Sequence, residues 1–311
     1  MVNNHTLLQR PFISLSNNMQ SQLLYIPDFP NFYTYDPSIN LALKTNNRHI
    51  KVSHTSAIAL CQENEKLEYF ILGGESSKGF NFLKITPSEL KSNRFYYNEV
   101  NRISPRSCIF QENLYLIGGF INQIPSSSCV VFDMDQFQRN SKNVRSNNVA
   151  DLNFARADFG ICSTKRYIFA IGGSGKFGFM ASCERYDGTQ WVLLQLSLPA
   201  PSCRLGVIPI FDDFLIIIGG RIRKTDNIRG ESSKTYLFDV SAGNITEYKD
   251  LKYGGCVLFP FLEHENSFLA ASSQEVNHKL VKVEAENIDW IKYRLSLMLW
   301  YSLKKEYGKY I

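Results

Sequence analysis

The stretch NLYLIGGF, residues 113–120, ends an apolar strand on two adjacent glycines, the residue type that weakens strands most. The same event recurs in YFILGGE (69–75), IFAIGGS (168–174) and LIIIGGR (215–221). The first glycines of the four pairs are separated by 45, 54 and 47 residues. A strand-containing repeat of this period is typical of a β-propeller built from four-stranded blades.

A second landmark follows each of the last three glycine pairs, a strand that ends in an aromatic residue and an aspartate. It is SCVVFD (128–133), SCERYD (182–187) and TYLFDV (235–240). A third landmark is a tryptophan in the last strand of a blade. We expect these positions to be structural, with the aspartates capping the turns that follow them. The residues concerned are Gly73, Gly74, Gly118, Gly119, Gly172, Gly173, Gly219, Gly220, Asp133, Asp187, Asp239, Trp191 and Trp290.

These landmarks together resemble the Kelch repeat family, and AIGGSG…CERYDGTQW is the closest match within the chain. The resemblance implies an all-β propeller that occupies residues 1–311 as a single domain. Residues 32–44 look like the third and fourth strands of a partial blade within 1–49, and residues 295–311 are the candidate segment to complete it. We therefore expect six blades closed by strands from both termini, with five or seven as alternatives. The complete blades are predicted at 50–100, 102–150, 153–200, 204–250 and 253–294.

The glycine pairs are explained if the backbone at the end of the second strand of each blade turns outward where neighbouring segments approach it closely. Glycine allows the backbone to approach closely and to take a positive φ. We expect the large aromatic residue of the third strand to pack over the space that a side chain would fill.

Composition indicates an ordinary soluble protein with a large core, since 44% of its 311 residues are hydrophobic and its formal net charge is +5. No apolar run approaches the roughly 18–20 residues of a membrane helix. The N-terminal residues do not read as a secretory signal, so we expect a cytoplasmic protein. Cys108 and Cys162 occupy one equivalent repeat position and Cys129 and Cys183 another, which favours small buried sites over reactive thiols.

The sequence contains no pattern that predicts catalysis or a cofactor. The five histidines are dispersed without metal-ligand spacing. The glycine-rich segments GGESSKG (73–79) and GGSGKFG (172–178) do not match a phosphate-binding loop, and a propeller explains their glycines without a nucleotide. We therefore predict no catalytic residue, no metal and no cofactor.

Basic residues recur near the loops that a Kelch propeller places on one face. Arg102 and Arg156 each precede their glycine pair by 16 residues, and Arg204 precedes its pair by 15. Such residues can bind carboxylates of an acidic partner, because arginine forms bidentate pairs with them. The alternative is that they are solvated or brace their own blade through a backbone carbonyl. The candidate partner-binding residues are Arg102, Arg106, Arg156, Arg204, Arg221, Arg223, Lys224 and Arg229. Nucleic acid is not expected, because these residues are not interleaved with loop aromatics that stack on bases.

The leading functional prediction is a noncatalytic protein-interaction propeller that serves as a subunit of a larger assembly. The resemblance implies a cytoskeletal or ciliary one. The first alternative is a stand-alone receptor that binds an acidic peptide on the arginine face for a separate ligase or kinase. The second is an enzyme with an active site at the mouth of the central channel.

Overall fold

The computed structural model of the chain describes a defined set of residues. They are 23–28, 31–36, 41–46, 56–63, 66–73, 80–86, 91–97, 102–138, 142–223, 229–248, 250–251, 255–257, 262–264, 267–276 and 279–289. Gly74, Lys224, Trp290 and the segment 295–311, to which the sequence assigns roles, lie outside these ranges.

The first sheet contains three antiparallel strands: β1 (Leu23–Asp28), β2 (Asn31–Asp36) and β3 (Leu41–Asn46). The sequence predicts only two strands here, over 32–44. The segment that precedes them adds β1, which pairs with β2.

Four sheets of four antiparallel strands follow in chain order. The second sheet is β4 (Ala57–Glu63), β5 (Lys66–Leu72), β6 (Phe80–Thr86) and β7 (Lys91–Tyr97). The third is β8 (Arg106–Phe110), β9 (Asn113–Ile117), β12 (Cys129–Asp133) and β13 (Asn147–Val149). The fourth is β14 (Gly160–Ser163), β15 (Ile168–Ile171), β18 (Ser182–Tyr186) and β19 (Trp191–Ser197). The fifth is β21 (Gly206–Phe211), β22 (Phe214–Ile218), β25 (Thr235–Asp239) and β26 (Asn244–Glu247).

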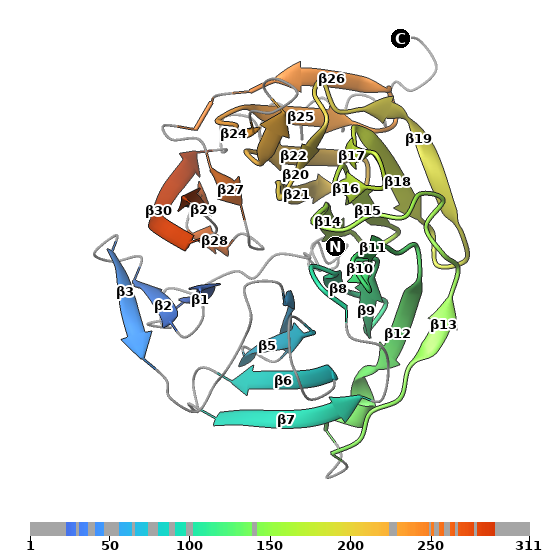
Figure 1. Cartoon of the computed structure of the whole chain (residues 1–311), viewed down its shortest axis with the longest axis vertical. Helices are drawn as coiled ribbons and strands as arrows, with labels where there is room; N and C mark the ends of the chain where they lie inside the picture. Colours follow the sequence, from blue (N-terminus) through green and yellow to red (C-terminus); the bar gives the residue numbers. More distant parts are fainter. Residues whose placement is uncertain are drawn as a thin grey trace, which may run out of the picture.

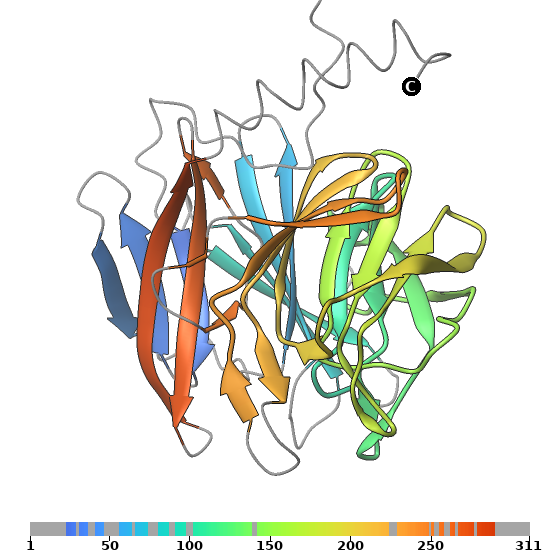
Figure 2. The same ribbon diagram turned by 90° about the horizontal axis from the view of Figure 1, so that it is seen from above.

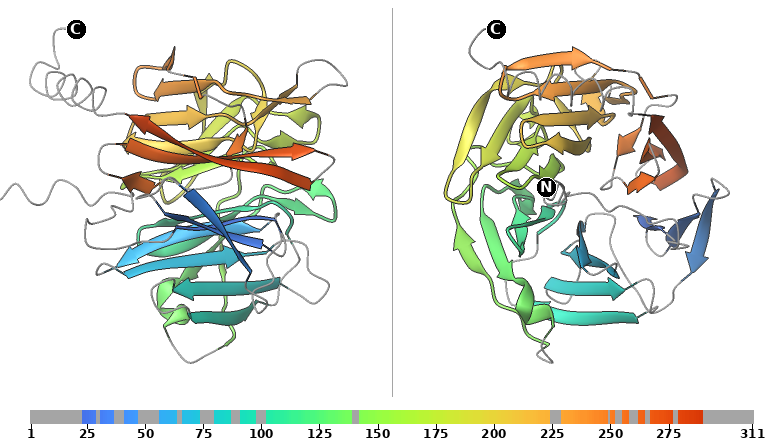
Figure 3. Two further views of the ribbon diagram at one scale, coloured as in Figure 1. Left: turned by 90° about the vertical axis from the view of Figure 1, so that its left-hand side faces the viewer. Right: turned by 180° about the vertical axis from the view of Figure 1, so that it is seen from behind.

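The last sheet is built around β29 (Ser267–Val276), which pairs with β30 (Lys279–Asp289) along one edge. Along its other edge it pairs with two short strands, β27 (Cys256–Val257) and β28 (Leu262–His264). β30 lies beside β1 and β3. Figures 2 and 3 show the same neighbourhood, with the last sheet (red) standing next to the first (blue).

The sheets are arranged in sequence order around a common centre (Figure 1). In the third, fourth and fifth sheets the first strand lies nearest the centre, and the last strand lies on the outer rim. The helical element among the described residues is a single 3-10 turn, η3 (Met134–Phe137). The predicted all-β class is confirmed, and the arrangement is propeller-like.

Among the described side chains, the core lies between successive sheets, with buried clusters between the second and third, the third and fourth, and the fourth and fifth. Between the second and third sheets the rings of Phe82 and Phe132 meet edge to face, with centroids 4.7 Å apart. Between the third and fourth, Tyr115, Tyr186 and Trp191 belong to one buried cluster. Burial of such aromatic side chains on both faces is what holds neighbouring sheets together.

The glycine pair that follows β9 lies at the junction with the next sheet. Gly118 and Gly119 have φ values of +60° and +94°, and the Gly119 N–H donates to the carbonyl of Arg156 at 2.9 Å. The aromatic residue that packs against Gly118 is Phe159, just before β14 of the next sheet. The prediction of a third-strand aromatic at this place is wrong. The two atoms nearest a Cβ on Gly118 belong to the next sheet, whereas Gly119 is crowded by Ile103 and Pro105, which precede β8 of its own sheet.

The aspartates at the ends of the third strands cap turns. Asp133 Oδ1 accepts from the Asp135 N–H at 2.9 Å, and Asp239 Oδ1 accepts from the Ala242 N–H at 2.8 Å. Asp187 Oδ1 accepts from the N–H groups of Thr189 and Gln190 at 2.8 and 2.9 Å. Bonds from Thr189 and Gln190 to the ionised carboxylate lower the pKa of Asp187 to about 2.

Candidate partner-binding face

Short hairpins follow the glycine pairs of the third, fourth and fifth sheets, and we call the surface they form the hairpin face. Each hairpin pairs with the segment that precedes the innermost strand of its own sheet, through Ile103–Phe120, Ala157–Ser174 and Cys203–Arg221. The Kelch resemblance predicts that the loop after each glycine pair and the loop before the first strand lie on one face. In these three sheets the two loops are paired with each other, as predicted. The hairpins are β10 (Phe120–Ile121) with β11 (Ile124–Pro125), β16 (Ser174–Gly175) with β17 (Gly178–Phe179), and β23 (Arg221–Arg223) with β24 (Arg229–Glu231), which β20 (Ser202–Cys203) joins.

Arg156 lies inside the fourth sheet, with 0% of its surface exposed. Its Nη1 donates to the carbonyls of Gly172 and Ser182 at 2.8 and 2.9 Å. Its Nη2 lies 2.6 Å from Glu184 Oε1, in an ion pair that is buried on both sides. Burial lowers the pKa of the Arg156 guanidinium, and the Glu184 carboxylate opposes that shift.

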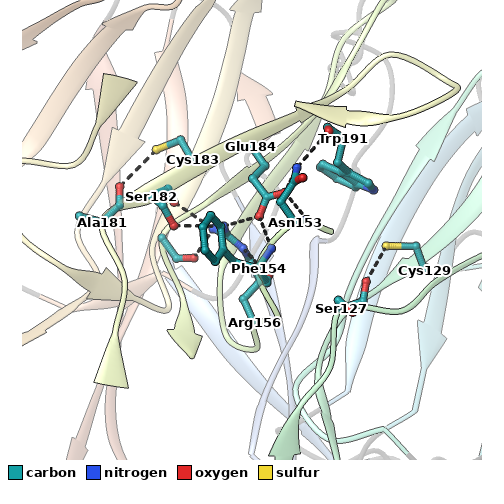
Figure 4. Close-up of polar contacts among 11 residues, drawn as sticks. Ser127, Cys129, Asn153, Phe154, Arg156, Ala181, Ser182, Cys183, Glu184 and Trp191 are labelled. Atoms are coloured by element: carbon teal, nitrogen blue, oxygen red, sulfur yellow. Dashed lines mark hydrogen bonds and ion pairs between the residues drawn. The ribbon is translucent and has the colours of Figure 1, made fainter. Parts of the chain in front are cut away.

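Glu184 organises the loop before Arg156 as well as Arg156 itself (Figure 4). Its carboxylate accepts from the Asn153 N–H at 2.7 Å, from Asn153 Nδ2 at 2.9 Å and from the Phe154 N–H at 3.1 Å. With Arg156, these donors satisfy a charge that would otherwise be costly to bury. Glu184 was not among the residues predicted from the sequence. The available signal was its position two residues before Tyr186, because residues at this spacing share a strand face and Tyr186 is buried.

Arg102 occupies the same place in the third sheet and is also buried. Its Nη1 donates to the carbonyls of Gly118 and Ser128 at 3.2 and 2.7 Å. Cys129 and Cys183 occupy equivalent positions, because each pairs with the last residue of the second strand of its sheet. The next residue is Val130 in the third sheet and Glu184 in the fourth, so Arg102 has no acidic residue at the position of Glu184. The prediction that Arg102 and Arg156 bind a partner is corrected, because both guanidinium groups are enclosed by their own sheets.

Arg106 and Arg204 come together at Asp158, a residue that the sequence did not single out. Arg106 Nη2 lies 3.8 Å from one carboxylate oxygen of Asp158, and Arg204 Nε lies 3.5 Å from the other. The Arg106 Nε also donates to the Phe159 carbonyl at 2.7 Å. These contacts join three successive sheets on the hairpin face, and the three side chains remain partly exposed.

The β23–β24 hairpin carries the remaining described candidates. Arg221 stands opposite Glu231 in the register, and Arg223 stands opposite Arg229. Arg223 is exposed, and its Nη2 lies 3.1 Å from where a Cβ on Gly178 would be. The Arg223 side chain therefore reaches the β16–β17 hairpin of the preceding sheet.

Large apolar side chains protrude from the same loops. Phe177, at the tip of β16–β17, is 92% exposed, Ile124 is 67% exposed, and Phe154 is 46% exposed. The Lys176 ammonium lies 5.6 Å from the centre of the Phe177 ring. These residues were not predicted from the sequence. For Phe177 the available signal was an aromatic residue between two glycines in GSGKFG (173–178).

The described residues give no metal site, because they contain no group of three or more His, Cys, Asp or Glu side chains placed to hold an ion. Cys108, Cys129, Cys162 and Cys183 are buried and free. Burial raises the pKa of each of these thiols, to about 12 for Cys129 and Cys183. These four cysteines therefore pack as small apolar residues. Within the described ranges, the chain has no helix with the length and apolarity needed to cross a membrane.

Comparison with known proteins gives a likeness in fold. No protein-family profile matches the chain, and no curated protein matches its sequence. Among solved structures the chain is similar to that of YjhT, with a TM-score of 0.60 and 12% identity over 83% of this chain and 91% of that one. At this identity the likeness concerns the fold alone.

Proposed function

We propose that the chain is a noncatalytic protein-interaction propeller of the Kelch type, with six blades closed by strands from both ends of the chain. The proximity of β30 to β1 and β3 supports closure between the first and last sheets. The repeated glycine pairs and turn-capping aspartates support the Kelch assignment.

The observation that carries the interaction role is the exposure of Phe177 and Ile124 on hairpins that the fold holds firmly. Large apolar side chains that gather on one face of a protein mark interaction sites more often than scattered ones do. The hairpins are anchored by paired backbone bonds, such as the 2.7 Å bond from the Ser174 N–H to the Ala157 carbonyl. An anchored hairpin loses little conformational entropy when a partner binds.

The role we favour is that of a subunit in a larger cytoplasmic assembly, cytoskeletal or ciliary in kind. Affinity purification of the tagged protein under mild lysis, followed by size-exclusion chromatography and mass spectrometry, tests this. A large, stoichiometric particle that resists salt is the expected result. Elution as the free chain of 35.6 kDa at all salt concentrations would contradict it.

Replacing Phe177 by serine is expected to remove the chain from that particle without changing its thermal midpoint. The side chain is 92% exposed, so its loss leaves the core intact while removing roughly 2 kcal/mol of burial energy at an interface. Tyr96→Ser is the matched control, because Tyr96 is also exposed but lies on β7 at the outer rim. Equal retention of Phe177→Ser and the wild type in the particle would contradict a role for this face.

A second candidate function is a receptor for an acidic peptide, which hands its ligand to a separate ligase or kinase. The convergence of Arg106 and Arg204 at Asp158 favours it, because both arginines approach one partly exposed carboxylate on the hairpin face. A carboxylate-rich peptide presents the same chemistry to them.

Replacing Arg204 by alanine is expected to weaken binding of such a peptide by about tenfold or more, since a charge-assisted hydrogen bond contributes about 1.5–3 kcal/mol. Arg166→Ala is the matched control. Arg166 is also a partly exposed arginine paired with aspartates, at 2.8 and 3.1 Å, but it lies between β14 and β15 at the end of the sheet away from the glycine pair. Titration of a fluorescent poly-glutamate peptide measures both variants, and an equal loss in both would contradict a specific arginine site.

A further inference from the structure

The outer edge of the fourth sheet differs from the edges of its neighbours. It is formed by β19, which reads Trp191-Val-Leu-Leu-Gln-Leu-Ser197 and lies on the outer rim (Figure 1). The strand contains seven residues, no charge and no proline. Val192 and Leu193, next to each other in its first half, are 40% and 46% exposed. Natural proteins usually protect such edges with charges, proline, bulges, short strands or a covering segment. The pairing of β19 with β18 is irregular between Leu193 and Ser197, so the regular part of this edge is Trp191–Leu193.

The outer strands of the second, third and fifth sheets are protected in these ways. The edge of β7 is covered by a segment of the next sheet, through bonds from the Tyr96 N–H to the Lys142 carbonyl at 2.7 Å and from the Val144 N–H to the Tyr96 carbonyl at 3.0 Å. β13 has three residues, two of them asparagine, and β26 has four and ends in Glu247. The β25–β26 connection, residues 240–243, is too short to cover β19 as residues 142–144 cover β7.

The backbone of Leu193 faces outward from this edge. The bond from the Asp187 N–H to the Gln190 carbonyl begins the ladder between β18 and β19, and Val192 and Leu193 are paired with Arg185 and Glu184. Bonded and non-bonded pairs alternate in an antiparallel ladder, so the Leu193 N–H and C=O point away from β18. The Trp191 carbonyl, which points the same way, accepts from Asn153 Nδ2 at 3.0 Å. Apart from this side-chain bond, no backbone group of the described residues is bonded to the outer side of β19.

We propose that β19 pairs antiparallel with β19 of a second copy of the chain, about a two-fold axis centred on Leu193. In that arrangement the Leu193 N–H of each copy donates to the Leu193 carbonyl of the other. A bonded antiparallel pair has this two-fold symmetry, so the surface is complementary to itself.

The composition of the edge favours a second copy over a charged partner. Symmetric pairing about Leu193 sets Trp191 against Gln195 and Val192 against Leu194 of the other copy, so no like charges are brought together. The pairing also covers the exposed side chains of Val192 and Leu193. An acidic or basic strand would find no opposite charge within β19.

A contact made by one strand is smaller than a standard protein interface, so the dimer is weak. We expect a dissociation constant on the order of 10–100 µM. Sedimentation velocity of the full chain over a concentration series that spans this range is the measurement. A monomer at every concentration would overturn the proposal.

Leu193→Pro removes the outward N–H without removing a bond between β18 and β19, because proline is tolerated at an edge position whose N–H faces solvent. Leu193→Lys keeps the backbone and places two like charges at the two-fold axis. Both variants are expected to weaken the dimer by about tenfold or more. If circular dichroism shows that the proline variant does not fold, the dissociation constant of the lysine variant tests the proposal.

Phe177→Ser is the matched control, since it removes a more exposed apolar side chain away from any strand edge. It is expected to leave the dimer unchanged. A dimer that survives Leu193→Lys, or one that Phe177→Ser weakens equally, would show that association does not use the β19 edge.

Discussion

Replacing Arg156 by alanine is expected to lower the free energy of unfolding by about 3–5 kcal/mol. The variant would leave the Glu184 carboxylate in a fully buried site without its 2.6 Å ion-pair partner. The carbonyls of Gly172 and Ser182 would each lose the Arg156 donor as well, although the Ser182 carbonyl would keep the bond from the Gly172 N–H at 3.1 Å. Three donors from Asn153 and Phe154 would still reach the carboxylate, which places the effect toward the lower end of the range. Urea denaturation followed by tryptophan fluorescence measures it.

Arg102→Ala is the matched control for the ion pair. Arg102 also donates to two carbonyls from an equivalent position, but Val130 stands where Glu184 would be. The loss of hydrogen bonds alone is expected to cost about 1–3 kcal/mol. The double replacement Arg156→Met with Glu184→Leu removes both charges and should recover much of the stability lost in Arg156→Ala. Equal destabilisation by Arg102→Ala and Arg156→Ala would show that the buried charge is not the cause.

This expectation differs from the sequence-based one, in which the loss of Arg156 removes a partner and spares the fold. The spacing of 16 residues between each arginine and its glycine pair is correct, and it has a structural meaning. Arg102 and Arg156 each donate to the carbonyl of the first glycine of their own pair. The constant spacing of 16 residues therefore reflects a hydrogen bond between each arginine and its own glycine pair.

Arg204 shows why counting residues placed it in the wrong register. Its equivalents are Ser104 and Asp158, because all three have φ near +50° and their backbones are bonded in series. Ser202 stands at the place of Arg156, since its carbonyl accepts from the second glycine of the preceding pair as that of Arg156 does. The irregular pairing between Pro209 and Phe211 changes the spacing in the fifth sheet. The partly exposed position of Arg204 could not be read from the count.

The repeat predicted the sheets because each strand and its glycine pair are set by nearby residues. The contact of β30 with β1 depends instead on strands more than two hundred positions apart, and no local pattern specifies it. Phe177 illustrates a different limit. Hydrophobicity assigns a phenylalanine to the core, whereas the tight β16–β17 hairpin holds this one out at its tip.

Replacing Gly118 by alanine is expected to destabilise the protein by about 2–5 kcal/mol, as the sum of two effects. The residue has φ +60°, a conformation that costs an L-amino acid roughly 1–2 kcal/mol. In addition, the new Cβ would collide with the carbonyl oxygen of Arg156 and approach Cε1 of Phe159 to 3.1 Å. Both contacts belong to the next sheet, so relief of the clash would displace the segment that holds Arg156.

Gly243→Ala separates the two effects, because Gly243 has φ +68° in the turn before β26 and a Cβ there would meet nothing within 4 Å. It is expected to cost roughly 1–2 kcal/mol from backbone strain alone. The difference between the two variants in urea denaturation then measures the contact between the third and fourth sheets. If Gly118→Ala costs no more than Gly243→Ala, the glycine pairs are required for their backbone conformation and not for the close approach of neighbouring sheets.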